Sequence, residues 1–439
     1  MKTIRDAVHG DIELDDLEIA LLDTPAMQRL RGIKQLGTSN LVYPSASHTR
    51  FEHSLGTLWM TKRMLRVLRA DDPSISDAEE RTARLAALLH DITHVPFGHT
   101  FEDERRLFER HDEDEDRLAR YLDRPPISTL LDQSGVRDEV RGVLTARAAG
   151  RPFVRELVTG TVCADLLDYL RRDATMSGLA LSYDDRLLQA FRLSDNHLVV
   201  RLHKHGGFRH DTLSELIRLL QIRYNLTERV YYHHAKVVSG AMVSRALELA
   251  LGLGAIAKKD LFELRDDSLL DRLMMHADRD QGLKDVLSDL AGRQLFKRAY
   301  YLTMERFGQR GLDDATRDQL AKRFHQDLEG RRALERELAR RLDIPPAHVI
   351  VYCPSPAMSL KEANVPVEIS PGQVEPLSNL GHPDVAALTE KHRALWSFTI
   401  CLRRTHAALL PSASALCEGL VGYPNQLHPQ EQGRLAFRA

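Results

Sequence analysis

The sequence predicts a mainly α-helical protein with a smaller α+β subdomain at its C-terminal end, and three observations support this fold class. The 439 residues, 43% of them hydrophobic, are enough to bury a large core. Long segments repeat apolar residues at the three-and-four spacing of amphipathic helices, at residues 79–90, 212–250 and 318–342. Short β-rich runs punctuated by proline and glycine follow, at residues 348–356, 365–370 and 396–402.

Local signals place several element boundaries. A helix should begin around Asp23–Pro25, because proline is favoured in the first helical turn, and another after Ser76–Asp77, ahead of two glutamates. A short hairpin is expected near residues 198–210, with Gly206–Gly207 at or near its turn. The expected divisions of the chain are a helical domain over residues 1–341, an α+β subdomain over 342–425 and a loose tail over 426–439.

Composition limits the classes of function. Lysine and arginine number 61 against 63 aspartates and glutamates, so no overall basic field indicates nucleic acid or an anionic membrane. The longest apolar runs fall far short of a membrane span, and the N-terminus lacks the apolar core of a secretory signal. The four scattered cysteines argue against a disulfide framework or a zinc ribbon. These features predict a cytoplasmic globular protein.

The most informative local feature is the pair His90 and Asp91, which directly follows the apolar run of residues 85–89. An imidazole and a carboxylate are costly to bury without a partner, and a divalent cation suits both. Side chains of adjacent helical residues point about 100° apart. The pair can therefore share an ion only near a helix end or distortion, which Pro96 and Gly98 supply.

Two further residues could complete such a site. His53 precedes a helix-forming run, and Asp165 lies among apolar neighbours. Two imidazoles and two carboxylates suit Mn, Fe, Ni, Co or Zn better than Ca or Mg, and an octahedral ion would keep positions open for water and substrate. Taken singly, each of these residues has a simpler interpretation as a hydrogen-bonded core residue.

A second pair suggests proton transfer. His99 and Glu102 are spaced i, i+3, so the carboxylate can hold the imidazole in one tautomer and stabilise its protonated form. This is a general acid or base arrangement, and His94 and His111 lie close to it in the sequence. The alternative is that Glu102 opens the acidic, solvated stretch of residues 102–116.

Several sequence strings resemble those of the HD-domain phosphohydrolases, in particular the deoxynucleoside triphosphate triphosphohydrolase branch. They are AVHGDIEL, DTPAMQRLRGIKQLG, SHTRFEHSLG, LLHDITHVPFGHTFE and DLLDYLRRD. The resemblance follows roughly the first 240 residues motif by motif and the C-terminal part in general layout. It implies an HD-domain helical core in which a metal-polarised water attacks the α-phosphorus of a dNTP. The products would be a deoxynucleoside and inorganic triphosphate.

The resemblance also implies roles for particular residues. One divalent transition metal per subunit would be bound by His53, His90, Asp91 and Asp165. The residues around the phosphates, with Mg accompanying the nucleotide, would be Arg50, His94, His99, His111, Tyr169 and Arg223. The residues near the sugar and base would be Gln35, Asp173, Tyr231 and His233. The alternative for Tyr231 is a place in a core aromatic stripe with Tyr224 and Tyr232.

One position departs from the pattern of the family. Relatives commonly have lysine or arginine directly after the last metal-binding aspartate, but here Leu166 follows Asp165. A cation beside the phosphates is therefore missing. The main alternative is an HD-type phosphatase acting on nucleoside mono- or diphosphates or another small phosphoester. The candidates to replace the charge are Arg171, Arg172, Lys236 and a neighbouring subunit.

A third set of residues concerns regulation and assembly. Lys2, Asp23, Gln28 and Arg31 resemble positions at which activator-dependent relatives hold a guanine nucleotide between subunits. The alternatives are that Asp23 caps a helix and Arg31 is a surface cation. The resemblance implies a homo-oligomer, a dimer or tetramer, with a nucleotide substrate. A nucleotide sensor or single-stranded nucleic acid binder is a third hypothesis, which the near-neutral charge and complete ligand set disfavour.

Overall fold

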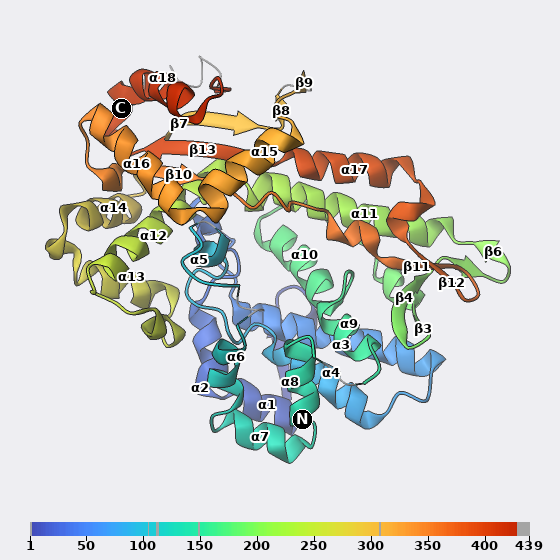
Figure 1. Cartoon of the computed structure of the whole chain (residues 1–439). Coiled ribbons are helices and arrows are strands. Elements are labelled where there is room, and N and C mark those ends of the chain that lie inside the picture. The colour runs from blue at the N-terminus through green and yellow to red at the C-terminus, as the bar shows by residue number, and fades with distance from the viewer. Residues whose placement is uncertain (1, 104, 111–113, 148–149, 307–308, 428–439) are drawn as a thin grey trace.

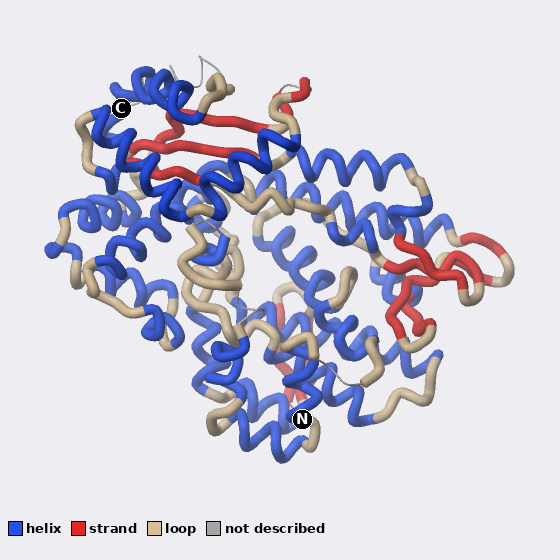
Figure 2. The backbone as a smooth tube through the Cα atoms, viewed as in Figure 1, coloured by secondary structure: helices blue, strands red, loops and turns tan. Residues whose placement is uncertain are grey.

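The computed structural model confirms a mainly α-helical protein with a smaller α+β part (Figure 1). It describes residues 2–103, 105–110, 114–147, 150–306 and 309–427. Figure 2 shows the strands confined to small sheets around an otherwise helical molecule. None of the described helices is both long enough and apolar enough to cross a lipid bilayer.

Three helices form the centre of the N-terminal half: α3 (Arg50–Asp71) packs against both α4 (Asp77–Leu89) and α10 (Ala164–Met176). The start of α4 is where the sequence predicts it. Ser76 Oγ accepts the backbone N–H of Glu79, and the Glu79 carboxylate accepts that of Ser76, which forms a capping box. The surrounding helices are α1 (Asp16–Leu22), α2 (Pro25–Arg29), α5 (Thr100–Asp103), α6 (Glu115–Leu122), α7 (Ile127–Ser134), α8 (Arg137–Leu144) and α9 (Phe153–Thr159).

The helix predicted at Asp23–Pro25 is present as α2, but its cap is Thr24. The Thr24 hydroxyl accepts the backbone N–H of Met27 at 3.4 Å, while Asp23 closes the preceding helix α1. The suggestion that Asp23 caps this helix is therefore wrong. Thr24 has extended backbone angles ahead of Pro25, which is the geometry that an N-cap requires.

The long helix expected over residues 212–250 is broken in two. α11 (His210–Leu226) continues into a π-helical turn at Thr227–Tyr231, and α12 (His234–Gly252) starts anew. The π turn accompanies a hydrogen bond that the Tyr231 hydroxyl donates to Asp173 on α10. Periodicity continues through this segment because both halves bury one apolar face, so the break does not show in the sequence pattern.

The strands predicted near the C-terminus are present as β10 (Val349–Tyr352), β11 (Pro366–Ser370) and β13 (Ser397–Leu402). The predicted hairpin is also present, as β5 (His203–Lys204) and β6 (Gly207–Phe208) with Gly206 at positive φ in the turn. The other strands are β1 (Lys2–Asp6), β2 (Gly10–Leu14), β3 (Phe191–Ser194), β4 (His197–Arg201), β7 (Lys297–Thr303), β8 (Glu305–Arg306), β9 (Gln309–Arg310) and β12 (Gln373–Pro376).

The division of the hydrophobic cores does not coincide with the expected boundary at residue 342. The sheet of the C-terminal lobe has the order β10-β13-β7, so the second core already begins at Ala299 on β7. In the other direction, β11 pairs in parallel with β4 of the N-terminal half. Strand pairing therefore joins segments far apart in the sequence, and no boundary placed by local composition could show it. The proposed tail over residues 426–439 falls almost wholly outside the described residues.

Helices of the second half cover the C-terminal sheet and extend over the first half. α15 (Asp314–Ala321), α16 (Leu328–Leu342) and α18 (Leu410–Val421) lie around the sheet, at the upper left of Figure 1. α17 (Pro383–Ala394) packs along α11, and α12 packs against α14 (Gln281–Ala291) beside α13 (Asp266–Met274). The chain after residue 340 thus reaches the helices that carry the predicted site residues.

Candidate metal centre and active site

The structure brings the four predicted metal ligands together from three helices. His53 lies in the first turn of α3, His90 and Asp91 directly follow α4, and Asp165 lies in the first turn of α10. His53 Nε2 is 3.2 Å from His90 Nε2 and 2.9 Å from an oxygen of Asp165. The Asp91 oxygens lie 3.8 Å from His53 Nε2 and 3.5 Å from His90 Nε2.

His90 and Asp91 can share this place because the helix ends just before them. α4 stops at Leu89, and His90 is its C-cap. The sequence predicts that Pro96 and Gly98 disrupt the helix. Both residues lie beyond the point at which α4 has already ended. The buried side chains of Leu88 and Leu89 anchor this end of α4 in the core.

Both imidazoles are oriented for metal binding. The Nδ1 atom of His90 is 2.8 Å from the carbonyl oxygen of Ala87, and that of His53 is 2.7 Å from a carboxylate oxygen of Asp168. A proton on each Nδ1 leaves both Nε2 lone pairs directed at one place. Two nitrogen ligands about 2.1 Å from one ion and at a right angle would be about 3 Å apart, so this spacing fits a shared cation.

The electrostatics of His53 agree with a cation at this place. Burial alone would lower the pKa of His53, but the hydrogen bonds that it donates to Asp165 and Asp168 outweigh burial and raise this pKa to about 10. The two carboxylates therefore favour a positive charge at His53, at the place where a bound cation would lie.

Asp91 also organises the groups beside the ligands. Arg50 Nη1 donates to one Asp91 oxygen at 2.7 Å, and His94 Nε2 is 3.0 Å from the other. Burial would raise the pKa of Asp91, but the charges of Arg50, His90 and His94 hold it well below its usual value. Asp91 is therefore ionised, and the buried guanidinium of Arg50 is held against the ligand cluster.

The predicted pair of His99 and Glu102 is formed. His99 Nδ1 is 3.0 Å from Glu102 Oε2, and the imidazole is partly exposed while the carboxylate is buried. The alternative that Glu102 opens a solvated acidic stretch is wrong, because Arg117 binds its second oxygen at 3.1 Å inside the protein. His94 lies next to the pair, with ring centroids of His94 and His99 4.8 Å apart. His111 lies outside the described residues.

A polar group suited to a sugar hydroxyl lies on α10 beyond the ligands. Asp173 accepts a hydrogen bond from the Tyr231 hydroxyl at 2.6 Å and is 2.8 Å from His48 Nε2. Gln35 adjoins this group, since its backbone N–H donates to the carbonyl of His48. The Gln35 side-chain oxygen is buried and has no hydrogen-bond partner among the described residues. Tyr231 is thus more than a member of an apolar stripe.

Arg223, which the sequence predicts beside a phosphate, lies between two aromatic rings. Its guanidinium carbon is 5.4 Å from the Tyr169 ring centroid and 5.2 Å from that of Tyr231. Its Nε is 3.4 Å from a carboxylate oxygen of Glu362, which belongs to the C-terminal half. Glu362 could not be predicted as a site residue, because an isolated glutamate far along the chain carries no local signal. His233 is the N-cap of α12, and its ring centroid lies 6.1 Å from that of Tyr43.

The proposed replacements for the missing cation are mostly engaged elsewhere. Leu166 is buried in the core. Arg171 pairs with Asp185, and Arg172 is fully buried against Asp6 and Asp168. Neither arginine is therefore available to a phosphate at Leu166.

The proposed effector residues are only partly brought together. Arg31 donates to the Gln28 side chain at 2.9 Å and stacks on Phe51 with its guanidinium carbon 3.6 Å from the ring centroid. Among the contacts of the described residues, none joins the side chain of Lys2 or Asp23 to this pair. A complete effector site would need groups from elsewhere, and the four residues stay a prediction.

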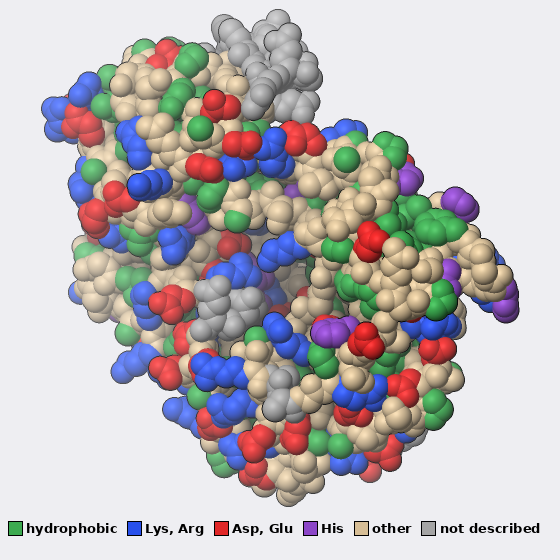
Figure 3. Space-filling view, turned by 45° about the vertical axis from the view of Figure 1, so that its right-hand side comes forward, with side chains coloured by type: hydrophobic (Ala, Val, Ile, Leu, Met, Phe, Trp, Pro, Cys, Tyr) green, Lys and Arg blue, Asp and Glu red, His purple; other side chains and the backbone are tan. Residues whose placement is uncertain are grey.

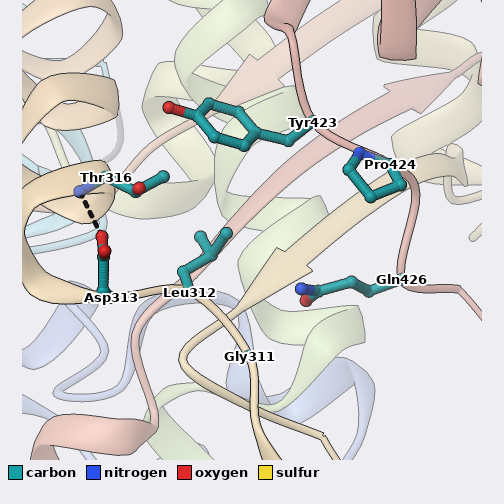
Figure 4. A pocket seen from close by; sticks show the side chains of 7 residues that line it. All are labelled: Gly311, Leu312, Asp313, Thr316, Tyr423, Pro424 and Gln426. Atoms are coloured by element: carbon teal, nitrogen blue, oxygen red, sulfur yellow. Dashed lines mark hydrogen bonds between the residues drawn. The ribbon is translucent and has the colours of Figure 1, made fainter.

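A separate cavity of about 530 Å³ lies in the C-terminal lobe (Figure 4). It is lined by Gly311, Leu312, Asp313, Thr316, Tyr423, Pro424 and Gln426. Asp313 caps α15 through the backbone N–H of Thr316, and the Tyr423 hydroxyl bonds to Gln319. Its titratable side chains therefore have structural partners, and none of the predicted site residues lines it. The surface is also hollowed between the C-terminal lobe and the N-terminal half, with basic side chains around the opening (Figure 3).

A helical scaffold that gathers two imidazoles and two carboxylates, beside an acid–base pair and an arginine, defines a metal-dependent hydrolase. Residues 50–173 match the HD domain, and residues 184–416, more than half of the chain, match the HD associated region. The chain belongs to the HD-domain phosphohydrolase family.

Two relatives in sequence and one solved structure are similar to this chain. An uncharacterised protein of Methanocaldococcus jannaschii is 32% identical over 278 residues, which are 62% of this chain and 55% of that protein. The deoxynucleoside triphosphate triphosphohydrolase SAMHD1 homolog of Dictyostelium discoideum is 28% identical over 321 residues, 67% of this chain and 59% of that protein. The chain thus spans between half and two thirds of the length of these relatives. A crystal structure of a phosphohydrolase from Bacteroides thetaiotaomicron has the same fold, with a TM-score of 0.71 at 22% identity, covering 92% of this chain and 100% of that one.

Proposed function

We propose that the protein hydrolyses deoxynucleoside triphosphates to a deoxynucleoside and inorganic triphosphate at the centre formed by His53, His90, Asp91 and Asp165. The observation that carries this proposal is the pair of groups that flank the ligands. His99 and Glu102 can hold and transfer a proton, while Asp173 with Tyr231 can bind a sugar hydroxyl. The similarity to the deoxynucleoside triphosphate triphosphohydrolase homolog of Dictyostelium discoideum supports the same reaction.

Each group of the site has a defined task in this reaction. A divalent transition metal, when bound, supplies Lewis-acid polarisation of a water molecule and of a phosphoryl oxygen. Arg50 and Arg223 stabilise the charge that develops on the phosphoryl oxygens. His99, oriented by Glu102, gives a proton to the departing 5′ oxygen. Asp173 accepts the hydrogen bond that the 3′-hydroxyl donates, and Gln35 adjoins it.

The reaction is tested by identifying the products. Purified protein supplied with Mn²⁺ is incubated with dNTPs, NTPs and nucleoside monophosphates, singly and in mixtures, and the products are separated by chromatography. We expect inorganic triphosphate and deoxynucleoside from dNTPs. Orthophosphate as the sole phosphate product would overturn this assignment.

A second function is favoured by the charges beside the phosphate site. Leu166 removes one cation, and Glu362 partly neutralises Arg223 at 3.4 Å. Fewer free cations suit a substrate with less negative charge, such as a nucleoside mono- or diphosphate or another small phosphoester. Release of orthophosphate from monophosphates in the same assay would identify this activity.

The His99→Gln variant should lower kcat by about 100- to 10,000-fold, because a positioned general acid contributes a factor of this size. The His99 side chain is 40% exposed, so the fold should tolerate the change. The measurement is the steady-state rate at saturating Mn²⁺, with bound metal determined in parallel. Equal metal content and an unchanged kcat would remove His99 from the proton-transfer step.

Asp173 should set the preference for a 3′-hydroxyl. The wild type should favour a dNTP over its 2′,3′-dideoxy analogue, because an unpaired buried acceptor costs about 1–3 kcal/mol, or about 5- to 150-fold in kcat/KM. In the Asp173→Asn variant this ratio should fall towards one. The Tyr231→Phe variant, which keeps the ring but loses the hydroxyl bonded to Asp173, is the matched comparison. If the ratio of kcat/KM between the two substrates stays high in Asp173→Asn, a group other than Asp173 binds the 3′-hydroxyl.

Assembly and regulation belong to the same proposal. We infer a cytoplasmic homo-oligomer, a dimer or tetramer, whose effector residues would be Lys2, Asp23, Gln28 and Arg31. Faster hydrolysis of nucleotide mixtures than of single nucleotides would support an effector site. The mass in solution, measured by light scattering with and without nucleotide, tests the assembly.

A further inference from the structure

The N-terminal hairpin is linked to the proposed metal centre through one buried carboxylate, that of Asp168. His9 lies at the turn between β1 and β2, and its Nε2 is 2.6 Å from one oxygen of Asp168. The other oxygen of Asp168 is 2.7 Å from Nδ1 of His53. The side chains of these three residues are at most 1% exposed. One buried carboxylate therefore joins the hairpin to a proposed metal ligand.

A second tether holds the same turn. Arg172 donates to both oxygens of Asp168, at 3.0 Å each, and to an oxygen of Asp6 at 2.8 Å. Asp6 in turn accepts the backbone N–H groups of Val8 and His9 at 2.9 and 2.8 Å, which fixes the shape of the turn. The hairpin is thus bound to α10 by an imidazole and by an arginine bridge.

Asp168 packs closely against the backbone of α3. α3 passes α10 at Gly56, where a β-carbon would lie 1.8 Å from an oxygen of Asp168 and 2.4 Å from Nη2 of Arg172. A glycine is required here because any side chain would displace this carboxylate. The direction of the His53 ring therefore depends on Asp168, and the place of Asp168 depends on its partners from the hairpin and α10.

We infer that His9 is a positioning residue of the metal centre. It holds Asp168 so that His53 directs Nε2 at the metal, and metal binding and docking of the hairpin stabilise each other. Groups that orient a ligating histidine commonly change metal affinity by about 10- to 100-fold. The coupling must be reciprocal, because both effects share one free energy. The inference rests on the proposed metal centre but not on the identity of the substrate.

The test uses the full-length protein and Mn²⁺ alone. Metal is removed by dialysis against a chelator, and affinity is measured by titration against a competing fluorescent chelator. We expect His9→Leu to bind Mn²⁺ about 10- to 100-fold more weakly than the wild type. His9→Gln should recover part of the affinity, because its amide can donate near the position of Nε2. The matched control is Arg5→Ala, which removes an exposed side chain of the same hairpin that pairs with the exposed Asp11.

Hydrogen exchange of residues 2–14 gives a readout independent of the variants' activity. In the wild type, Mn²⁺ should slow exchange in this segment, and in His9→Leu the slowing should be lost. Circular dichroism of the metal-free proteins shows whether each variant folds. If His9→Leu does not fold, the hydrogen exchange of the wild type with and without Mn²⁺ still tests the coupling. Absence of Mn²⁺ binding by the wild type would overturn the metal centre itself. If the wild type binds Mn²⁺ normally, two results would overturn the role of His9 and leave the metal centre in place. One is an unchanged Mn²⁺ affinity in a folded His9→Leu variant, and the other is that Mn²⁺ has no effect on hydrogen exchange of the hairpin.

Discussion

The His90→Ala variant is expected to lose both Mn²⁺ binding and phosphohydrolase activity, with kcat/KM lower by about 1,000-fold or more, because metal ions contribute several kcal/mol to such transition states. His90 presents Nε2 to the place that it shares with His53, and its Nδ1 contacts only the Ala87 carbonyl of its own helix among the bonds described. Removal of the ring should therefore cost the metal site far more than the fold.

The measurements are bound metal, Mn²⁺ affinity by calorimetry and steady-state kinetics. A suitable control is His197→Ala, which removes an exposed histidine that bonds to Glu156 on the surface. A His90→Ala protein with wild-type metal content and rate would exclude His90 from the centre. A variant without metal that kept full biological activity would instead favour the hypothesis of a nucleotide sensor or nucleic acid binder.

The Glu335→Ala variant is expected to lower the free energy of unfolding by about 3–5 kcal/mol, the usual cost of leaving a buried charge without its partner. Glu335 on α16 accepts two hydrogen bonds from Arg105, at 2.7 and 2.9 Å, and one from Arg245 at 3.3 Å. It also accepts the backbone N–H of Val351 on β10. Its removal would leave two arginine side chains poorly compensated inside the protein.

The matched control is Glu337→Ala on the same helix. Glu337 is partly exposed and pairs with Arg340 and Arg341 at the surface, where ion pairs contribute at most about 1 kcal/mol. Thermal and urea unfolding followed by circular dichroism compare the two variants. Equal losses of stability in both would show that the buried network contributes no more than a surface pair.

The same network makes stability depend on pH in a defined direction. Burial alone would raise the pKa of Glu248, but the charges of Arg105 and Arg245 outweigh it and lower this pKa to about 2. The ordinary value in the unfolded chain is about 4.3. The contribution of Glu248 should therefore be fully present above about pH 5 and be lost as the pH falls towards 2.

Much of the metal centre could be predicted from the sequence. His90 and Asp91 stand out because polar ligands end an apolar helix, and the strings around His53 and Asp165 resemble a known family. The reason for the geometry was predicted less well. The helix ends at Leu89 rather than through a disruption at Pro96 and Gly98, because His90 itself forms the C-cap.

The groups that support the centre could not be predicted in this way. His9, His48, Asp168 and Glu362 come from separate elements, and each is an ordinary polar residue in its local sequence. For Glu102, by contrast, the local sequence gives a misleading signal. Its neighbours form an acidic stretch typical of solvent, yet Arg117 holds it inside the protein. Tertiary packing determines which side chains contact these polar residues and therefore whether they are buried and charged. Local composition does not specify these contacts.

The sequence by itself determined the mainly helical class, the hairpin, the C-terminal strands and the identity of the four candidate ligands, because periodicity, turn residues and ligand types are local properties. Only the tertiary structure decided where the cores divide, how α11 and α12 break apart, and which side chains orient the ligands. β7 joins the C-terminal sheet and β11 joins β4 across long stretches of chain. Such pairings depend on the simultaneous burial of distant surfaces. Tertiary packing likewise places Glu362 beside Arg223 and His9 beside Asp168, which are far apart in the sequence.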